Sequence, residues 1–266
     1  FSGCYMALFS FSSLITIKKN KMVKTMIDKL KIKIFADGAD IKNIEDLCKN
    51  PLIKGFTTNP SLMKKKGILD YKKFAVDVLK VVGDKPVSFE IFADDLNEME
   101  EQANEIASWG KNINVKIPIT NTKGEKTNEL IKKLSNKKII CNVTAILTID
   151  QLKSVVDILN PETPAILSIF AGRIADTGID PIKTMSEAVK IAKSKPLASI
   201  LWASTRQIYS IFDAESTGCQ IITVPHDLIK KFTGLGKNLD QLSLETVKMF
   251  YEDAKQAGYK IQTNDK

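Results

Sequence analysis

Short apolar runs alternate along the chain with longer segments in which apolar residues recur at helical spacing. The runs predict eight β-strands and the longer segments predict helices, because a strand repeats every two residues and a helix every 3.6. The predicted strands are 32–36, 53–56, 87–91, 113–117, 138–141, 165–168, 197–201 and 221–224. The predicted helices lie near 43–48, 61–82, 95–109, 125–135, 149–159, 181–194, 205–215 and 226–232, with a last one near 242–257.

This order of elements predicts the fold class. Eight βα units without a Pro/Gly-rich linker are typical of an α/β protein with a single (β/α)₈ TIM barrel, here with an additional C-terminal helix. A doubly wound sheet is the alternative, but no GxGxxG motif follows the first strand. We therefore assign residues 29–266 to one barrel domain.

Residues 1–28 are left out of this fold. Residues 4–17 are apolar and rich in serine, but they are too few to span a bilayer, and no basic segment precedes them as in a secretory signal. Met22 or Met26 would make a natural start just before the first strand. We expect a disordered, tag-like or upstream-translated extension, with a targeting segment as the alternative.

The composition is that of an ordinary globular protein, with 44% hydrophobic and 26% charged residues. The net charge of +8 is unevenly placed, since residues 1–33 carry seven lysines and only one acid, Asp28. The remainder is almost balanced, so we expect neither nucleic acid nor a membrane as a partner.

Cysteine and histidine exclude several kinds of site. Cys4, Cys48, Cys141 and Cys219 are scattered without a CxxC pair, so they indicate neither a zinc site nor a disulfide framework. Free thiols suit a reducing compartment, and we expect a cytoplasmic protein. His226 is the only histidine, which excludes mechanisms and metal sites that need two.

In a TIM barrel the chemistry lies at the carboxyl ends of the strands and in the loops that follow. Seven consecutive predicted strands end in polar or charged groups, whereas the strand bodies are apolar. These groups are Asp37, Asn59, Glu90, Lys116, Asn142, Thr144, Ser168, Arg173, Ser204 and Arg206.

Lys116 is the most informative of them. The alternation of the fourth strand puts Lys116 and Asn114 opposite Val115 and Ile117, so Lys116 faces the barrel interior if the branched residues pack against the helices. Desolvation favours a neutral amine, which attacks a carbonyl to form a Schiff base. An ion-paired or snorkelling structural lysine is the alternative.

Two acids and two arginines complete the candidate chemistry. Asp37 and Glu90 would supply the proton transfers that carbinolamine formation and C–C cleavage need, and a helix cap or a salt bridge is the alternative for each. Arg173 and Arg206 are the only arginines and both follow a strand end, where their planar guanidinium groups suit phosphate. Salt bridges to neighbouring acids are the alternative for these two.

A set of motifs in order along residues 32–260 resembles transaldolase. They are FADGAD (35–40), GFTTNPSLM (55–63), SFEIFADD (88–95), NVKIPITN (114–121), CNVTAI (141–146), SIFAGRIADTG (168–178) and ASTRQ (203–207). The resemblance implies a Schiff-base role for Lys116, a C4-hydroxyl proton acceptor in Asp37, and dehydration and hydrolysis of the imine by Glu90 through a water molecule held with Thr144. It assigns a water site to Thr144, the dihydroxyacetone hydroxyls to Asn59, Asn142 and Ser168, an aromatic lining to Phe170, and a sugar-phosphate clamp to Arg173, Ser204 and Arg206.

The resemblance also implies an activity. A dihydroxyacetone unit would pass from sedoheptulose 7-phosphate or fructose 6-phosphate to glyceraldehyde 3-phosphate or erythrose 4-phosphate, in the non-oxidative pentose phosphate pathway. No metal or organic cofactor is implied, and we expect a homo-oligomer. The VKIPIT segment is similar to the compact subfamily, which includes fructose-6-phosphate aldolases with a glutamine at the position of Glu90. The glutamate favours transaldolase.

Three other functions stay open at this point. One is a fructose-6-phosphate aldolase that releases free dihydroxyacetone. Another is a noncatalytic barrel that binds sugar phosphates, although the joint presence of Lys116, Asp37 and Glu90 argues against it. The third is a basic protein that meets RNA or a membrane through residues 1–33.

Overall fold

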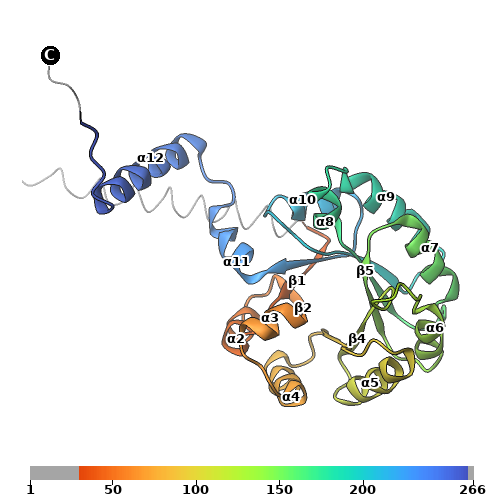
Figure 1. Ribbon diagram of the computed structural model, residues 1–266. Helices are drawn as coiled ribbons and strands as arrows, with labels where there is room; N and C mark the ends of the chain where they lie inside the picture. The colour runs from red at the N-terminus through yellow and green to blue at the C-terminus, as the bar shows by residue number, and fades with distance from the viewer. Residues whose placement is uncertain (1–29, 263–266) are drawn as a thin grey trace, which may run out of the picture. The chain divides into compact units, whose positions relative to one another are not determined.

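The computed structural model describes residues 30–262, and its strands close into a barrel (Figure 1). All neighbouring strands are parallel, and β8 pairs with β1 to close the sheet. The predicted (β/α)₈ TIM barrel is thereby confirmed. The strands are β1 (Lys33–Asp37), β2 (Ile53–Thr57), β3 (Val87–Glu90), β4 (Ile113–Pro118), β5 (Cys141–Ile146), β6 (Ala165–Ile169), β7 (Ala198–Trp202) and β8 (Ile221–Pro225).

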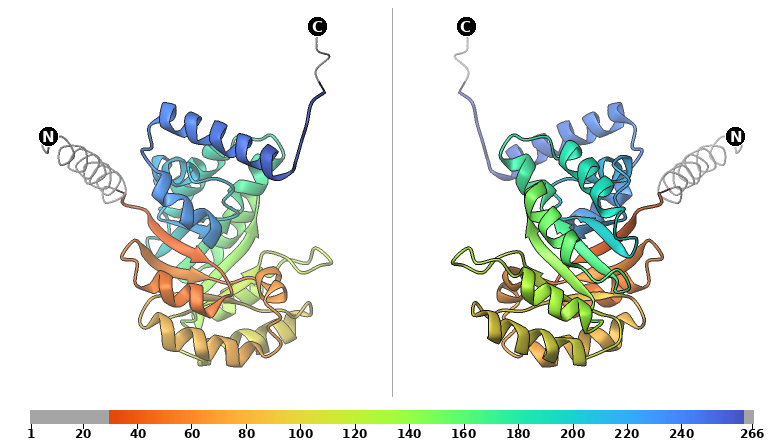
Figure 2. Two further views of the ribbon diagram at one scale, coloured as in Figure 1. Left: turned by 90° about the vertical axis from the view of Figure 1, so that its left-hand side faces the viewer. Right: turned by 90° about the vertical axis from the view of Figure 1, so that its right-hand side faces the viewer.

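Helices alternate with the strands and lie outside them around the barrel, as the side views show (Figure 2). Two helix starts follow the sequence closely: Thr148 forms a capping box with Gln151, and Asp180 caps the helix that begins with Pro181. The helices of the barrel are α2 (Ile41–Cys48), α3 (Pro60–Lys65), α4 (Tyr71–Val82), α5 (Leu96–Ser108), α6 (Asn128–Asn136), α7 (Ile149–Ile158), α8 (Ala171–Asp176), α9 (Pro181–Ala192), α10 (Ser210–Ser216) and α11 (His226–Ile229).

Residues Leu30–Lys231 form one compact unit that contains all eight strands. The residues from Phe232 onward belong to a second unit, which contains the predicted C-terminal helix as α12 (Leu239–Gln256). A 3₁₀ helix, η1 (Lys230–Gly234), follows α11 in the chain. The proposed extension, residues 1–28, lies outside the described residues, so the predicted domain limits stay a prediction. No helix in residues 30–262 is long and apolar enough to cross a membrane.

The two faces of each strand pack differently. On β4, Val115 and Ile117 are fully buried on the helix side, whereas Lys116 points into the barrel. A cluster of buried apolar residues packs among the strands, and two of its members, Leu201 and Ala203, also line the cavity at the carboxyl ends of the strands. A Cβ atom at position 55 would lie 2.6 Å from the Phe35 ring, so Gly55 leaves the space that this ring needs. The cluster consists of Phe35, Ile166, Leu201, Ala203 and Ile221.

Some predicted boundaries were wrong. The helix predicted at 61–82 is two helices, α3 and α4, separated at Gly67, whose φ of +65° belongs to the left-handed region. The fifth strand runs over Cys141–Ile146 rather than 138–141, because the polar residues of its second half face the barrel interior. Helix α8 was not predicted, since its six residues are too few to show a helical period.

Candidate active site

The carboxyl ends of the strands surround a cavity of about 470 Å³. This is the end of a TIM barrel at which catalytic groups gather. Every residue that the sequence predicted for the site lines this one cavity. The eleven residues are Asp37, Asn59, Glu90, Lys116, Asn142, Thr144, Ser168, Phe170, Arg173, Ser204 and Arg206.

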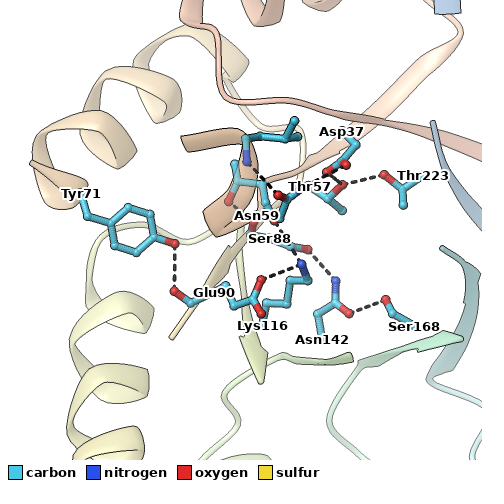
Figure 3. Close-up of polar contacts among 12 residues, drawn as sticks. Asp37, Thr57, Asn59, Tyr71, Ser88, Glu90, Lys116, Asn142, Ser168 and Thr223 are labelled. Atoms are coloured by element: carbon cyan, nitrogen blue, oxygen red, sulfur yellow. Dashed lines mark hydrogen bonds and ion pairs between the residues drawn. The ribbon is translucent and has the colours of Figure 1, made fainter. Parts of the chain in front are cut away.

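Lys116 lies in the middle of the polar wall and is only 8% exposed. Its Nζ atom donates to Glu90 Oε2 at 2.8 Å and to the backbone carbonyl of Thr58 at 3.2 Å (Figure 3). The β3–β4 register pairs Glu90 with Lys116 directly, so the strand backbones hold the two side chains together. Lys116 is therefore an ion-paired interior lysine whose amine faces an open cavity.

Asp37 ends β1 and is held by a hydrogen bond on each carboxylate oxygen. Thr57 Oγ1 donates to Oδ1 at 2.8 Å, and Asn59 Nδ2 donates to Oδ2 at 3.1 Å (Figure 3). Burial raises the pKa of Asp37 above its usual value, although the charge of Lys116 and the two hydrogen bonds act in the opposite direction. A carboxyl group with a raised pKa is suited to take up and return a proton near neutral pH.

Asn142 is fully buried between two serine hydroxyl groups. Its Nδ2 donates to Ser88 Oγ at 2.9 Å, and its Oδ1 accepts from Ser168 Oγ at 2.6 Å (Figure 3). Because Ser168 donates its only proton to Asn142, its lone pairs stay available to a ligand hydroxyl. The network thus fixes the orientation of the Asn142 amide at the cavity wall.

Thr144 lies at an irregular point of β5, where the register with β6 shifts between Val143 and Ile146. Ala145 has a φ of +61° there, a conformation that residues other than glycine rarely adopt. The buried Oγ1 of Thr144 has no hydrogen-bond partner among the described residues. A buried hydroxyl without a partner is a place for a water molecule or a substrate hydroxyl.

The two arginines differ in their surroundings. Arg206 donates through Nε at 3.1 Å and Nη2 at 2.5 Å to Asp176 Oδ2. Arg173 stacks over the Phe170 ring, with its guanidinium carbon 5.1 Å from the ring centroid, and forms no ion pair within residues 30–262. The salt-bridge alternative therefore holds for Arg206 and fails for Arg173.

A close backbone approach brings the two arginine segments together. Gly172 of α8 donates its N–H to the carbonyl of Ala203 at 3.3 Å. A Cβ atom at position 172 would lie 1.6 Å from the Ser204 carbonyl oxygen, which no larger residue permits. Ser204 itself has a φ of +64°. Glycine at 172 is thus what lets α8 reach the loop after β7.

Three further residues support the site: Thr57, which the sequence places in the polar run at the end of the second strand without a role, and Ser88 and Thr223, which were not predicted. All three are buried polar residues in the strands, and each hydrogen bonds to a predicted residue or to another member of this group. The alternation of each strand would have placed Thr57 and Thr223 on the interior face. Their small side chains and apolar neighbours masked this, since buried threonine and serine are common in ordinary strands.

His226 and the three cysteines within residues 30–262 do not line this cavity. His226 lines a second cavity of about 390 Å³, bounded by residues of α2, α3 and α11, and burial lowers the pKa of its imidazole. Cys48, Cys141 and Cys219 are free thiols. Residues 30–262 contain no group of three His, Cys, Asp or Glu side chains placed to hold a metal ion.

Solved structures of low sequence identity share the fold. One is a putative lyase/mutase from Burkholderia cenocepacia J2315, with a TM-score of 0.55 at 12% identity over 91% of this chain and 88% of that one. Another is a putative dihydrodipicolinate synthase family protein from Coccidioides immitis, with a TM-score of 0.51 at 14% identity over 73% of this chain and 66% of that one. At these identities the likeness supports the barrel fold alone.

Sequence comparison is more specific. A protein named "Probable transaldolase" from Dehalococcoides mccartyi is 35% identical over 74% of this chain and 88% of its own length. Another of that name, from a Thermoanaerobacter species, is 32% identical over 86% of this chain and all of its own length. The family model described as Transaldolase/Fructose-6-phosphate aldolase matches residues 34–263. The chain therefore belongs to the transaldolase/fructose-6-phosphate aldolase family, a family of aldolase-type enzymes.

Proposed function

We propose that this protein is a transaldolase that works through a Schiff base on Lys116. It would move a dihydroxyacetone unit from fructose 6-phosphate or sedoheptulose 7-phosphate to erythrose 4-phosphate or glyceraldehyde 3-phosphate. One observation carries the proposal: a buried lysine faces an open cavity with its Nζ atom 2.8 Å from a carboxylate, Glu90, and with a second carboxylate, Asp37, in the same wall.

Imine formation begins with a neutral amine. A proton that passes from Lys116 Nζ to Glu90 Oε2 leaves a lone pair on Nζ, which attacks the C2 carbonyl of the ketose. Glu90 then returns the proton to the C2 hydroxyl of the carbinolamine, which leaves as water. The unpaired hydroxyl of Thr144 supports a water site in the same wall, from which the imine is hydrolysed at the end of the cycle.

Aldol cleavage needs a base for the C4 hydroxyl. In this proposal Asp37 takes that proton, C4 becomes an aldehyde, and the electron pair of the C3–C4 bond moves into an enamine on the protonated nitrogen. The raised pKa of Asp37 supports this role, because the same carboxyl group must give the proton back when the acceptor aldehyde adds.

The remaining residues would hold the two ends of the sugar. Asn142, Ser168 and Asn59 are assigned to the hydroxyls of the three-carbon unit. Arg173, Arg206 and Ser204 are assigned to the phosphate, for which Arg173 has an uncommitted guanidinium group, and the Phe170 ring lines the path between them.

Assembly, location and pathway complete the proposal. We propose a homo-oligomer, because α12 buries none of its side chains and exposes Leu242, Val247 and Phe250. Mass determination by light scattering tests this, and a monomer at micromolar concentration would refute it. The free thiols at Cys48, Cys141 and Cys219 support a cytoplasmic location, and the proposed substrates are those of the non-oxidative pentose phosphate pathway.

Borohydride reduction in the presence of fructose 6-phosphate tests the Schiff base. The expected result is a three-carbon adduct on Lys116, found by peptide mass spectrometry. Lys116→Met should abolish the adduct, and Lys111→Met, which removes a lysine outside the cavity, should leave it unchanged. An adduct on another lysine, or none, would overturn the mechanism.

Acceptor dependence separates transaldolase from fructose-6-phosphate aldolase. A transaldolase consumes fructose 6-phosphate steadily only when erythrose 4-phosphate is present, and it forms sedoheptulose 7-phosphate. Steady release of dihydroxyacetone without an acceptor would instead identify a fructose-6-phosphate aldolase. The Lys116 adduct alone does not separate the two enzymes, because both would form it.

A further inference from the structure

Two buried threonine hydroxyls form a chain that ends on Asp37. Thr57 Oγ1 lies 2.8 Å from Asp37 Oδ1 and 2.6 Å from Thr223 Oγ1 (Figure 3). Thr57 is 3% exposed and Thr223 is 8% exposed. They come from β2 and β8, the two strands that flank β1, so the closure of the barrel is what brings them together.

The number of protons fixes the direction of this chain. A threonine hydroxyl has one proton to donate, and an ionised carboxylate only accepts. When Asp37 is ionised, the proton of Thr57 must therefore go to Asp37, and the proton of Thr223 must go to Thr57. Each of the two short contacts among Asp37 Oδ1, Thr57 Oγ1 and Thr223 Oγ1 then has one donor and one acceptor.

The chain also fits the protonated form of Asp37. A proton on Oδ1 lets Asp37 donate to Thr57, and Thr57 then donates to Thr223. Thr223 lines the cavity, so its own proton can reach water or a substrate hydroxyl. Rotation of the two hydroxyl groups thus gives Asp37 a hydrogen-bond partner both when it is ionised and when it is protonated. With Thr57 alone, the hydroxyl proton of Thr57 would have no buried acceptor when Asp37 is protonated.

We propose that Thr223 is a positioning residue for aldol cleavage, acting on Asp37 through Thr57. This inference rests on the proposed function, in which the proton of the C4 hydroxyl moves to Asp37 while the C3–C4 bond breaks. The electron pair of the C3–C4 bond forms the C2–C3 double bond of the enamine, the π pair of the protonated Lys116 imine returns to its nitrogen, and C4 becomes an aldehyde. The step is reversed on the acceptor aldehyde, so Asp37 changes its protonation state twice in each cycle.

Other charges also act on Asp37, and the variants below leave them in place. Lys116 and Glu90 face it from β4 and β3. On the other side, the second cavity also borders Asp37 and is lined by Asp40, Lys65, Lys66, His226, Asp227 and Lys230. Because Thr223 is uncharged, its replacement changes the hydrogen bonding of Asp37 and not the field of these groups.

Thr223→Val keeps the branched shape and removes only the hydroxyl. We expect it to lower kcat for transfer about tenfold, a part of the effect of a general base. Loss of the bond to Thr57 weakens the bond from Thr57 to the ionised carboxylate, so the acidic limb of the kcat/KM profile should move to higher pH. Thr223→Ser should restore both. Borohydride should still trap a Lys116 adduct in Thr223→Val, but a larger share of it should carry the uncleaved six-carbon sugar, because imine formation precedes the cleavage step that is slowed.

Each outcome of this experiment has one meaning. A wild-type protein that forms no Lys116 adduct refutes the proposed function itself, whatever Thr223 does. With the adduct present, an unchanged kcat and pH profile in Thr223→Val overturns the role of Thr223, as does a serine variant that fails to restore them. Thr163→Val, which removes a buried hydroxyl bonded to Ser135, gives the cost of such a loss in folding alone. If Thr223→Val does not fold, the comparison of Thr223→Ser with Thr223→Ala isolates the same hydroxyl.

Discussion

The Nζ atom of Lys116 and the Oε2 atom of Glu90 lie 2.8 Å apart on neighbouring strands in direct register. The resemblance implied that Glu90 acts through a water molecule, whereas here it contacts the amine itself. Only 11% of the Lys116 side chain and 17% of the Glu90 side chain are exposed. A contact held by two backbones and shielded from solvent places a proton acceptor beside the proposed nucleophile before any substrate binds.

Glu90→Gln tests whether this carboxylate moves protons. Glutamine keeps the shape and still accepts a hydrogen bond, but it cannot take a proton from Nζ. We expect imine formation to slow by about one to two orders of magnitude. We also expect the ratio of transfer to dihydroxyacetone release to fall, because the fructose-6-phosphate aldolases of the compact subfamily, which release dihydroxyacetone, have a glutamine at this position. Trapping rates and product ratios with erythrose 4-phosphate measure both.

Glu101→Gln is the control for this prediction, since Glu101 lies outside the barrel cavity. It should behave as the wild type in both measurements. A Glu90→Gln protein with an unchanged transfer-to-release ratio would refute the role in water activation.

Asp37→Asn tests a cost that the site imposes on the fold. Burial raises the pKa of Asp37 in the folded state, so folding binds a proton between the ordinary carboxyl pKa and the raised one. The wild type therefore loses stability as the pH rises through the raised pKa, and an asparagine does not. We expect Asp37→Asn to lose activity at least about 100-fold and to gain stability over the wild type on going from pH 4 to pH 8.

Urea unfolding of both proteins at the two pH values measures this difference. The comparison between pH values cancels the changes in packing that the substitution itself makes. A stability difference that does not change with pH would contradict a raised pKa for Asp37.

The fold could be predicted from the sequence because its elements repeat. The strand at 113–117, for example, can be recognised because apolar residues occupy every second position. Eight such short segments with helical segments between them allow few other architectures. The predicted boundaries were wrong where polar residues of the cavity wall interrupt a strand, as Asn142 and Thr144 do in β5. Helix α8 could not be predicted, because its six residues are too few to show a helical repeat of apolar positions.

The sequence predicted the members of the site that are charged or belong to a motif, but not the contacts between them. Lys116 and Glu90 stand out in apolar strands, but the direct contact between them depends on the β3–β4 register, which one strand alone does not encode. The contact of Thr57 with Thr223 depends on barrel closure across 166 positions. The pair of Arg206 with Asp176 likewise depends on the approach of α8 to the loop after β7, which sequence spacing does not reveal.

Gly172→Ala tests the backbone approach that joins the two arginine segments. Its new Cβ atom would lie 1.6 Å from the Ser204 carbonyl oxygen, which is backbone and cannot turn aside. We expect a loss of at least about 2 kcal/mol in the free energy of unfolding, comparable to an overpacked core, and a raised KM for sugar phosphates. Gly234→Ala, where the added Cβ meets nothing within 4 Å, is the matched control. Equal melting temperatures for the two variants would show that the approach is not a constraint.

The last prediction concerns the division of labour between the arginines. Arg173→Gln removes a guanidinium group without a carboxylate partner, and we expect it to raise KM for fructose 6-phosphate about 10- to 100-fold. Arg206→Gln should cost more, because it also removes the hydrogen-bonded partner of the Asp176 carboxylate beside the proposed phosphate site. The hydrogen bond from Arg206, and to a smaller extent the charges of Arg206 and Arg173, lower the pKa of Asp176. Adding Asp176→Asn to Arg206→Gln should then lower the KM for fructose 6-phosphate part of the way back, whereas Asp176→Asn alone should change this KM little.

The double-mutant cycle separates this repulsion from a simple loss of contact. Unphosphorylated fructose is the control substrate, because the loss of a phosphate contact should not change the KM of a substrate that has no phosphate. Recovery with fructose 6-phosphate and none with fructose would support the clamp and the opposing role of Asp176. A cycle in which the two substitutions simply add would mean that Asp176 does not act on the phosphate, and the pair with Arg206 would then be a surface ion pair of little energy.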